Sequence, residues 1–425
     1  MRQAFSRSSA AARTLVRRHR PDHQLVIYIG ILLLIGLVVL YAISPARVEF
    51  LNAGEGVSLD QTHFMQRQLL YLFIGIGAFI AAATIPLSFW KRNAAKLLIL
   101  SLVFCVLLLI FGIFSVPIAL CSGGACRWFD VGFTTFQPAE LVKFALLIYI
   151  AGFLSHKIKQ GTLNSIHDTL IPLGILVGTA IIFIVGFQKD MGTGLALIGI
   201  VASMLYLAGI NRQTGVLIAI TTIAAMIMFI LIAPHRLERV TTFLGKDGAE
   251  SAKTSSYHIT QAKIALGTGG VFGLGLGHNV QAFGYLPEAP NDSIFAVMGE
   301  AFGFVGAVCI LLFILGLLLR LLVIFDRVEN TTHRLIVAGV FGWIATHSVL
   351  NIGAMVGIIP LTGITLPLLS FGGTSLFFTM LSLGLVFHIS RYTVHGKISD
   401  DDTHKKNSHG RRGIWRSRYA NSRNY

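Results

Sequence analysis

Long apolar stretches decide what this chain can fold into: we find ten, each of about 20 residues, the length that crosses a bilayer. Only 12% of the residues are charged and 54% are hydrophobic, which excludes an ordinary soluble domain. In hydrocarbon, a helix satisfies its own backbone hydrogen bonds. The sequence therefore predicts an all-α polytopic membrane protein with ten transmembrane helices, centred near Leu34, Ala78, Leu107, Leu147, Val177, Ala202, Met226, Leu312, Ala345 and Leu381.

Lysine and arginine gather in the two terminal segments and in the loops after spans two, four, six and eight. These loops and both termini share one side of the membrane, which the excess of basic residues predicts to be the cytoplasm. We expect a basic cytoplasmic segment over residues 1–23, a membrane domain over 24–391 and a basic, disordered cytoplasmic tail over 392–425. Basic tails could bind nucleic acid, but ten spans favour contact with the anionic lipid of the bilayer instead.

Three longer loops are predicted on the opposite, extracytoplasmic side, over about residues 44–67, 117–138 and 234–292. The last, between spans seven and eight, is long enough to predict a functional role. In the second, a four-residue spacer separates Cys121 from Cys126. This spacing permits a disulfide in an oxidising compartment, and two free thiols are an equally open alternative. Because no histidine lies near them in the sequence, we expect no zinc site.

Carboxylates stand where residues 286–300 enter the eighth span: Glu288 and Asp292 before it and Glu300 within it. Acidic groups at the mouth of a membrane helix are costly unless they have a partner or a function. Asp292 has two compatible interpretations. It could cap the N-terminus of the helix, or it could act as a general base whose pKa is raised by low-dielectric surroundings.

A second group of charges surrounds the start of the fourth span. Glu140 and Lys143 are three residues apart, so they share a helix face and could form an internal ion pair. Alternatively, Lys143 with Arg127 above it forms a cationic site for a phosphate; both interpretations can hold together. Asp190, in the short turn before span six, is predicted either to cap that helix or to lie with Lys189 on the rim of the same outer cavity.

Glycine and proline punctuate two further regions. Residues 256–263 predict a short amphipathic helix on the membrane surface. The glycines of 267–277 lack the preceding strand of a dinucleotide site and predict close backbone packing instead. Residues 357–375 predict a broken helix held by protein or by a cavity. His347 and Asn351, one helical turn apart, are predicted to form interhelical hydrogen bonds rather than to act as ligands.

Five motifs resemble those of the SEDS family, the shape, elongation, division and sporulation proteins, and occur in the same order. They are FQPAELVKFALLIYIA, KDMGTGLALIGI, YHITQAKIALGTGGVFGLGLG, LPEAPNDSIFAVMGEAFGFVG and GIIPLTGITLPLLSFGGTSL, and the resemblance covers residues 26–391. It implies a peptidoglycan glycosyltransferase of the bacterial cytoplasmic membrane that polymerises lipid II, an undecaprenyl-pyrophosphate-linked disaccharide peptide, on the outer side. The LPEA and GITLP segments are more similar to division-type than to elongation-type members.

The resemblance also implies roles for particular residues. The family's essential aspartate, its charged pair in span four and the arginine before that span match Asp292, Glu140, Lys143 and Arg127. Two departures are Ser293, where the family has an aromatic residue, and Ala301, where it has a second glutamate; both leave the aspartate in place. We take Asp292 as the catalytic residue and expect six residues to bind substrate: Lys143, Glu140, Arg127, Asp190, Lys263 and Glu288.

In the implied reaction, Asp292 would take the proton from the 4-hydroxyl of the acceptor sugar. Lys143, with Arg127, would stabilise the leaving pyrophosphate, and Glu140 would orient the lysine. A divalent cation could assist, but no metal motif is recognisable and no metal ligand is assigned. The family works with a class B penicillin-binding protein, a transpeptidase, and with other divisome proteins. The alternatives are a lipid II flippase or transporter, an elongation-type polymerase and a non-catalytic scaffold.

Overall fold

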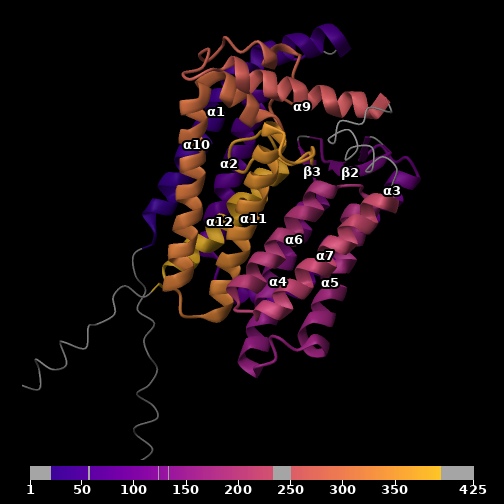
Figure 1. The fold of residues 1–425 in the computed structure, drawn as a ribbon, viewed down its shortest axis with the longest axis vertical. Helices are drawn as coiled ribbons and strands as arrows, with labels where there is room; N and C mark the ends of the chain where they lie inside the picture. Colours follow the sequence, from indigo (N-terminus) through magenta and orange to yellow (C-terminus); the bar gives the residue numbers. More distant parts are fainter. Residues whose placement is uncertain (1–20, 56–57, 123, 133, 233–249, 394–425) are drawn as a thin grey trace, which may run out of the picture.

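The computed structural model describes residues 21–55, 58–122, 124–132, 134–232 and 250–393. Most of the predicted segments 1–23 and 392–425 lies outside the described residues, as do residues 233–249 of the long loop. The described part is a bundle of long helices (Figure 1). At one end of the bundle, a small sheet and one transverse helix cover the helix ends.

All ten predicted spans coincide with helices of the described residues. Eight of these helical segments are long and apolar enough to cross a membrane. One of the eight is the run of 22 residues from Ile166 to Phe187, which has a short π-helical piece at each end. The sixth span is a 17-residue apolar helix. The bounds are α1 (His23–Glu55), α2 (His63–Thr84), α3 (Leu87–Ile113), α4 (Pro138–Gln160), η1 (Ile166–Leu170), α5 (Ile171–Ile181), η2 (Ile182–Phe187), α6 (Met191–Leu207), α7 (Arg212–Ile232), α10 (Ile294–Arg327), α11 (Thr331–Val356) and α12 (Gly373–Ser390).

α4, α11 and α12 form the interior of the bundle. Most of their residues are buried, whereas α3 and α5 expose many large apolar side chains, as helices that face lipid do. α12 packs against α2, α11 against α6, and α4 against α3; Figure 1 shows α11 and α12 between α10 and α6. Phe144 of α4 and Trp343 of α11 are fully buried. The polar residues on α4 and α11 are therefore enclosed by protein rather than by lipid.

The first outer loop is shorter than predicted. The sequence predicts a loop over residues 44–67, but α1 extends to Glu55 and α2 begins at His63. Side-chain hydrogen bonds hold the extension: Ser44 Oγ donates to Gln61 O (2.8 Å), and Asn52 exchanges two hydrogen bonds with the backbone of Leu59 (2.8 and 3.0 Å). The prediction of a loop was wrong because polar residues stabilise these last turns, so the apolar pattern ends before the helix does.

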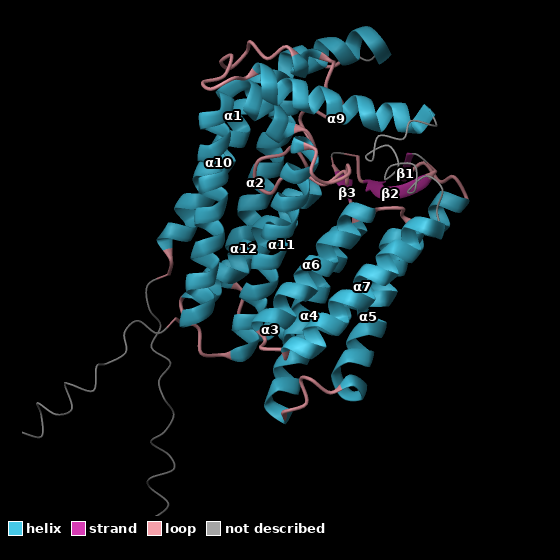
Figure 2. Ribbon diagram, viewed as in Figure 1, coloured by secondary structure: helices cyan, strands magenta, loops and turns pink. Residues whose placement is uncertain are grey.

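The second outer loop contains a three-stranded antiparallel sheet, with strands β1 (Ala119–Ser122), β2 (Ala125–Asp130) and β3 (Thr135–Phe136) in that order. Figure 2 shows the sheet in magenta at the same end of the bundle as α9, and β1 and β2 contact α3. The rings of Phe129 and Phe136 stack on one another and meet Phe104 of α3 edge to face. Cys121 and Cys126 form a disulfide. The all-α prediction therefore holds for the membrane part and needs this sheet added outside it.

The third outer loop contains α9 (Glu250–Thr268), which lies across the end of the bundle (Figure 1). A helix over residues 256–263 is confirmed and extends further at both ends; that it lies on the membrane surface stays a prediction. The glycines that follow it pack into a break in α10, where Gly303 has a φ of 68°. Leu274 N donates to Glu300 O, and Phe304 N donates to Gly270 O. The close backbone approach predicted for the glycines is thus made to the protein's own chain.

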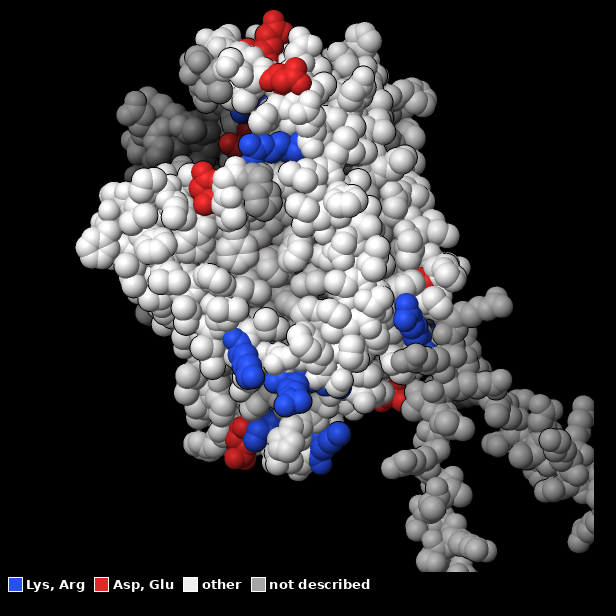
Figure 3. Space-filling model, turned by 180° about the vertical axis from the view of Figure 1, so that it is seen from behind, with Lys and Arg blue, Asp and Glu red and all other residues white. Residues whose placement is uncertain are grey.

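The two ends of the described chain meet at the opposite end of the bundle. Asp22 N donates to Ser390 Oγ (3.0 Å), and the Asp22 carboxylate pairs with Arg320 (2.6 Å). Figure 3 shows most of the visible lysines and arginines at this end. The two ends of the described chain therefore lie side by side at an end where lysine and arginine gather. That this end faces the cytoplasm stays a prediction.

Candidate active site

Asp292 lies in the turn that leads into α10, at the end of the bundle that carries the sheet and α9. The N-cap of α10 is Ser293, so Asp292 does not cap the helix as one interpretation held. Its backbone carbonyl accepts from Asn351 Nδ2 (2.7 Å). Its side chain is partly exposed and, among the described residues, has no hydrogen-bond or ion-pair partner. The main chain is therefore fixed while the carboxylate is available to a ligand.

The surroundings of Asp292 raise its pKa to about 7. The main cause is the exclusion of water by neighbouring protein, which disfavours the charged carboxylate. The carboxylates of Glu288 and Asp190 add repulsion, and the guanidinium of Arg127 acts in the opposite direction. Charged residues from three parts of the chain, the turn with Glu288 and Asp292, the turn with Asp190 and the strand with Arg127, are thus brought together. The pKa of Asp292 is suited to taking up a proton near neutral pH.

Arg127 and Asp190 reach this site from separate elements. Arg127, on β2, donates from Nε to Gln188 O and from Nη2 to Lys189 O, both at 3.1 Å. Asp190 caps α6 by accepting from Thr193 N (2.9 Å), which confirms the predicted cap. Its Oδ2 atom also accepts from Thr193 Oγ1 (2.8 Å) and from Gln137 Nε2 (3.0 Å). The strand and the turn before α6 are therefore tied together beside Asp292.

Glu140 and Lys143 form the predicted ion pair, with 2.7 Å between Oε1 and Nζ. Lys143 is fully buried; its Nζ also lies 3.0 Å from His347 Nε2 and 4.6 Å from the centre of the Trp343 ring. Because the ammonium can only donate, His347 must accept at Nε2 and donate from Nδ1 to Thr365 O (3.2 Å). The structure confirms the ion pair and shows that it is buried among α4 and α11.

The irregular segment between α11 and α12 links the buried pair to Asp292. Residues 357–372 are non-helical, which confirms the predicted break. His347 holds the carbonyl of Thr365, and Asn351 Nδ2 bridges the carbonyls of Ile364 and Asp292, both at 2.7 Å. A Cβ atom on Gly363 would lie 3.5 Å from Asp292 Oδ2, so this segment runs directly beside the carboxylate. The predicted interhelical hydrogen bond is confirmed for His347, which meets Lys143 of α4. Asn351 bonds instead to the turn before α10 and to the irregular segment.

Replacement of Asn351 by leucine should lower the free energy of unfolding by about 1–3 kcal/mol, because two carbonyls at the buried junction lose their donor. Thermal unfolding of the purified protein in detergent measures this loss. The control, Asn93→Leu, removes a bond within a single helix near the opposite end and should cost less. Equal losses in the two variants would contradict the bridging role.

The remaining predicted residues lie at different depths. Glu288 is exposed and accepts from Asn291 Nδ2 (2.5 Å). Lys263 is exposed on α9 and lies against Gly357, where an added Cβ would come within 2.6 Å of Nζ. Glu300 is fully buried and accepts from the backbone N–H groups of Val280 (2.9 Å) and Gln281 (3.1 Å). Glu300 therefore anchors the loop before Asp292, whereas Glu288 and Lys263 are accessible to a ligand.

Sequence reasoning missed one contact that supports the site. Ser293 Oγ donates to Pro287 O (2.8 Å), so the 2.6 Å contact with His258 requires Nε2 of the histidine to be the donor. The shielded position of His258 lowers its pKa, which favours the neutral ring. Ser293 stands where the SEDS pattern has an aromatic residue. The structure gives it a role: it ties α9 to the turn that carries Asp292.

In the described part of the chain, the long apolar helices, the transverse helix α9 and the partly exposed Asp292 at one end of the bundle define a polytopic membrane protein with a candidate active site near one membrane surface. The chain belongs to the FtsW/RodA/SpoVE family of cell cycle proteins, whose family model matches residues 23–395. The predicted SEDS membership is confirmed.

Two relatives illustrate the similarity. Stage V sporulation protein E of Bacillus subtilis (strain 168) is 33% identical over 378 residues, which cover 89% of this chain and 99% of the relative. The probable peptidoglycan glycosyltransferase FtsW of Escherichia coli O6:H1 is 34% identical over 343 residues, 80% of each chain.

Two solved structures are also similar. A solved chain from a peptidoglycan synthase complex has a TM-score of 0.65 at 23% identity, and the match covers 87% of this chain and 98% of that one. The rod shape determining protein RodA of Thermus thermophilus has a TM-score of 0.61 at 23% identity. The match covers 88% of this chain and 98% of that structure. These two structures show the same fold.

Proposed function

We propose that this protein is a peptidoglycan glycosyltransferase that polymerises lipid II into glycan strands at the outer face of the bacterial cytoplasmic membrane, for septal synthesis in cell division. The observation that carries the proposal is the Asp292 carboxylate, fixed through its main chain, unpaired among the described residues, and with its pKa raised to about 7. Relatives named probable peptidoglycan glycosyltransferase FtsW support both the reaction and the septal role. The end of the bundle with α9 is then the outer face.

Asp292 acts as the general base. The hydroxyl oxygen of the acceptor sugar attacks the anomeric carbon of the donor, and the hydroxyl proton moves to the Asp292 carboxylate. The bond between that carbon and the pyrophosphate oxygen breaks, and the polyprenyl pyrophosphate leaves with the electron pair. A base with a pKa near the working pH is the most effective for such a transfer.

Arg127 is the cation that we assign to the leaving pyrophosphate, because its guanidinium is partly exposed and acts on the same site as Asp292. Lys143, oriented by Glu140, contributes from below by holding His347 against the irregular segment. Lys263 and Glu288 are open to the sugars and phosphates.

A divalent cation would be held at this site by few protein ligands together with the substrate phosphates. In the described part of the chain, no group of three or more His, Cys, Asp and Glu side chains could hold a metal ion. The carboxylates of Asp292 and Glu288 are oxygen ligands of the kind that Mg²⁺ takes together with substrate phosphates. A cation bound in this way would neutralise charge on the pyrophosphate.

The partner that we infer is a class B penicillin-binding transpeptidase, acting with other divisome proteins. The similar fold in a peptidoglycan synthase complex described as coordinating polymerization and crosslinking supports a transpeptidase partner. Both termini lie in the cytoplasm in this arrangement, which agrees with the basic residues at the end opposite α9.

Reconstitution in proteoliposomes with labelled lipid II tests the proposal. We expect glycan polymer to form on the side that α9 faces, without net movement of lipid II across the bilayer. Translocation of lipid II without polymer would contradict the proposal and identify a flippase. The absence of both activities, in the presence of the transpeptidase, would favour a scaffold.

The rate of polymerisation should rise with pH through a midpoint near 7. Below the pKa of Asp292, the carboxyl group is protonated and cannot take the acceptor proton; above it, the base is available. The measurement is kcat/KM for lipid II from about one pH unit below that value to one unit above. Arg127→Gln should move the midpoint upward, because the guanidinium stabilises the charged carboxylate. A profile independent of pH would contradict the assignment.

A further inference from the structure

The Cys121–Cys126 disulfide lies directly beside the residue that we assign to the pyrophosphate, since Arg127 follows Cys126 in the chain. It closes the hairpin of β1 and β2 over the end of α3. A Cβ atom on Gly112 of α3 would lie 2.5 Å from Cys126 Sγ, a distance that real Cβ atoms do not reach. The disulfide therefore packs closely against α3 at Gly112.

Arg127 occupies an irregular point in the sheet. Cys121 pairs with Cys126 and Leu120 pairs with Trp128, so Arg127 is an extra residue on β2 without an opposite partner on β1. Bulges of this kind change the direction of a side chain and leave the ladder locally weak. The disulfide on one side of Arg127 and the Trp128 pairing on the other are what fix this point of the strand.

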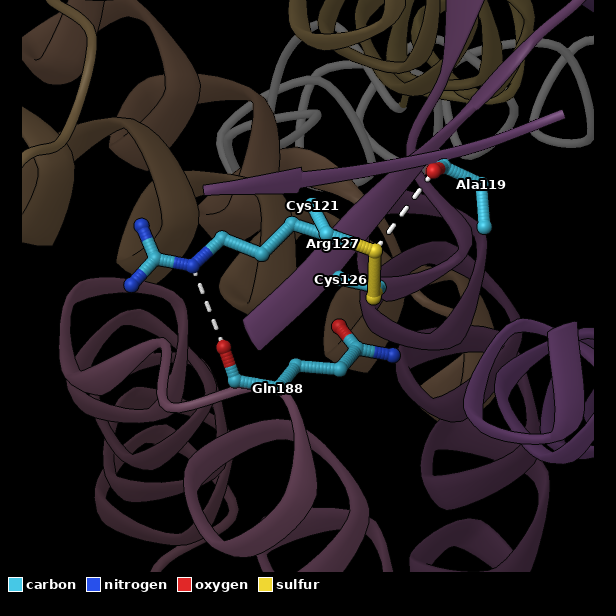
Figure 4. The surroundings of a disulfide bond; sticks show 5 residues. All are labelled: Ala119, Cys121, Cys126, Arg127 and Gln188. Atoms are coloured by element: carbon cyan, nitrogen blue, oxygen red, sulfur yellow. Dashed lines mark hydrogen bonds between the residues drawn. A yellow bond between two sulfur atoms is a disulfide. The ribbon is translucent and has the colours of Figure 1, made fainter. Parts of the chain in front are cut away.

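The guanidinium then reaches the turn before α6. Figure 4 shows Arg127 extending from the strand to the carbonyl of Gln188, whose side chain points back toward the disulfide. The second bond goes to the carbonyl of Lys189, which has a φ of 52°, in the left-handed region that side chains other than glycine rarely adopt. Asp190, next in the chain, adds its charge to the surroundings of Asp292. The conformation of this turn thus depends on where Arg127 is held.

We propose that the Cys121–Cys126 disulfide is a positioning element for the transferase reaction: it holds the bulge of β2 so that Arg127 clamps the turn at 188–190 beside Asp292. The proposal rests on the proposed function for its effect on rate. The two cysteines touch neither substrate nor the reacting atoms and act through Arg127. With only five positions separating the cysteines, the closed loop is short, so the disulfide restricts the unfolded chain less than one that closes a long loop would.

The test replaces both cysteines with serine and measures polymer formation from lipid II. We expect a rate about tenfold lower, as for a displaced binding group, and a pH midpoint moved upward because the guanidinium no longer favours the charged Asp292. The control is Cys309→Ser, which removes an exposed free thiol from α10 and should leave rate and midpoint unchanged. Reduction of the unmodified protein with a phosphine should reproduce the double variant.

Two further measurements separate positioning from general loosening. In an Arg127→Ala background, removal of the disulfide should cause no further loss; an additive loss would overturn the proposal. Amide hydrogen exchange at residues 188–190 needs no substrate and should quicken in the double-serine variant. If the unmodified protein made no polymer, the proposed function would fail, and the exchange result would still decide whether the disulfide holds the turn. Unchanged exchange, rate and midpoint would overturn the inference.

Discussion

Replacement of Asp292 by asparagine should lower the rate of glycan polymerisation by about 10²–10⁴-fold, the range that a positioned general base contributes. Asparagine has nearly the same shape but cannot accept the proton of the attacking hydroxyl. The anchoring bond from Asn351 goes to the backbone carbonyl, so the substitution leaves it in place. We therefore expect a folded, nearly inactive protein, measured as the length and amount of glycan chains formed from purified lipid II in the presence of the transpeptidase.

The control for this experiment is Asp168→Asn. Asp168 is an exposed carboxylate in η1, between α4 and α5, where it accepts a hydrogen bond from Ser165 Oγ (2.7 Å). Its replacement removes one negative charge without touching the site and should leave polymerisation unchanged. If correctly folded Asp292→Asn kept the activity of the control, the general base would have to be another group, and the scaffold interpretation would gain support.

The membrane architecture could be predicted from the sequence because hydrocarbon leaves few choices. Every apolar stretch of sufficient length must be a helix, and the basic loops must gather at one end. The Glu140–Lys143 pair was predictable for the same reason, since two charges three residues apart on a buried helix satisfy one another. The broken segment at 357–372 followed from its prolines and glycines.

The loops at the end of the bundle that carries α9 could be predicted less well. Water competes there for the backbone hydrogen-bonding groups, so tertiary contacts determine which residues form helix or strand. The extension of α1 depends on Asn52 meeting Leu59, and the sheet depends on Phe129 packing with Phe136 over α3. Neither contact leaves a periodic pattern in the sequence from which it could be predicted. The resemblance to the SEDS family pointed to Asp292, but the bond from Asn351 that fixes it joins residues 59 positions apart.

Lys143 is the second residue whose replacement should have a large effect. Methionine at this position would leave the Glu140 carboxylate almost entirely buried without its counter-charge. Removing one partner of a buried ion pair costs about 3–5 kcal/mol, so Lys143→Met should be severely destabilised. The measurement is thermal unfolding in detergent, with the exposed Lys263→Met as the matched control for loss of a lysine.

The double variant Glu140→Gln/Lys143→Met separates the two interpretations of the pair. With both charges gone, no uncompensated charge remains in the bundle, and most of the lost stability should return. Activity should stay low, because His347 loses the ammonium that fixes its Nε2 atom and no longer holds Thr365 O in one orientation. The irregular segment beside Asp292 would then be loosened at the point where Gly363 lies against the carboxylate. A double variant that is both stable and fully active would show that the buried pair stabilises the bundle and has no part in the reaction.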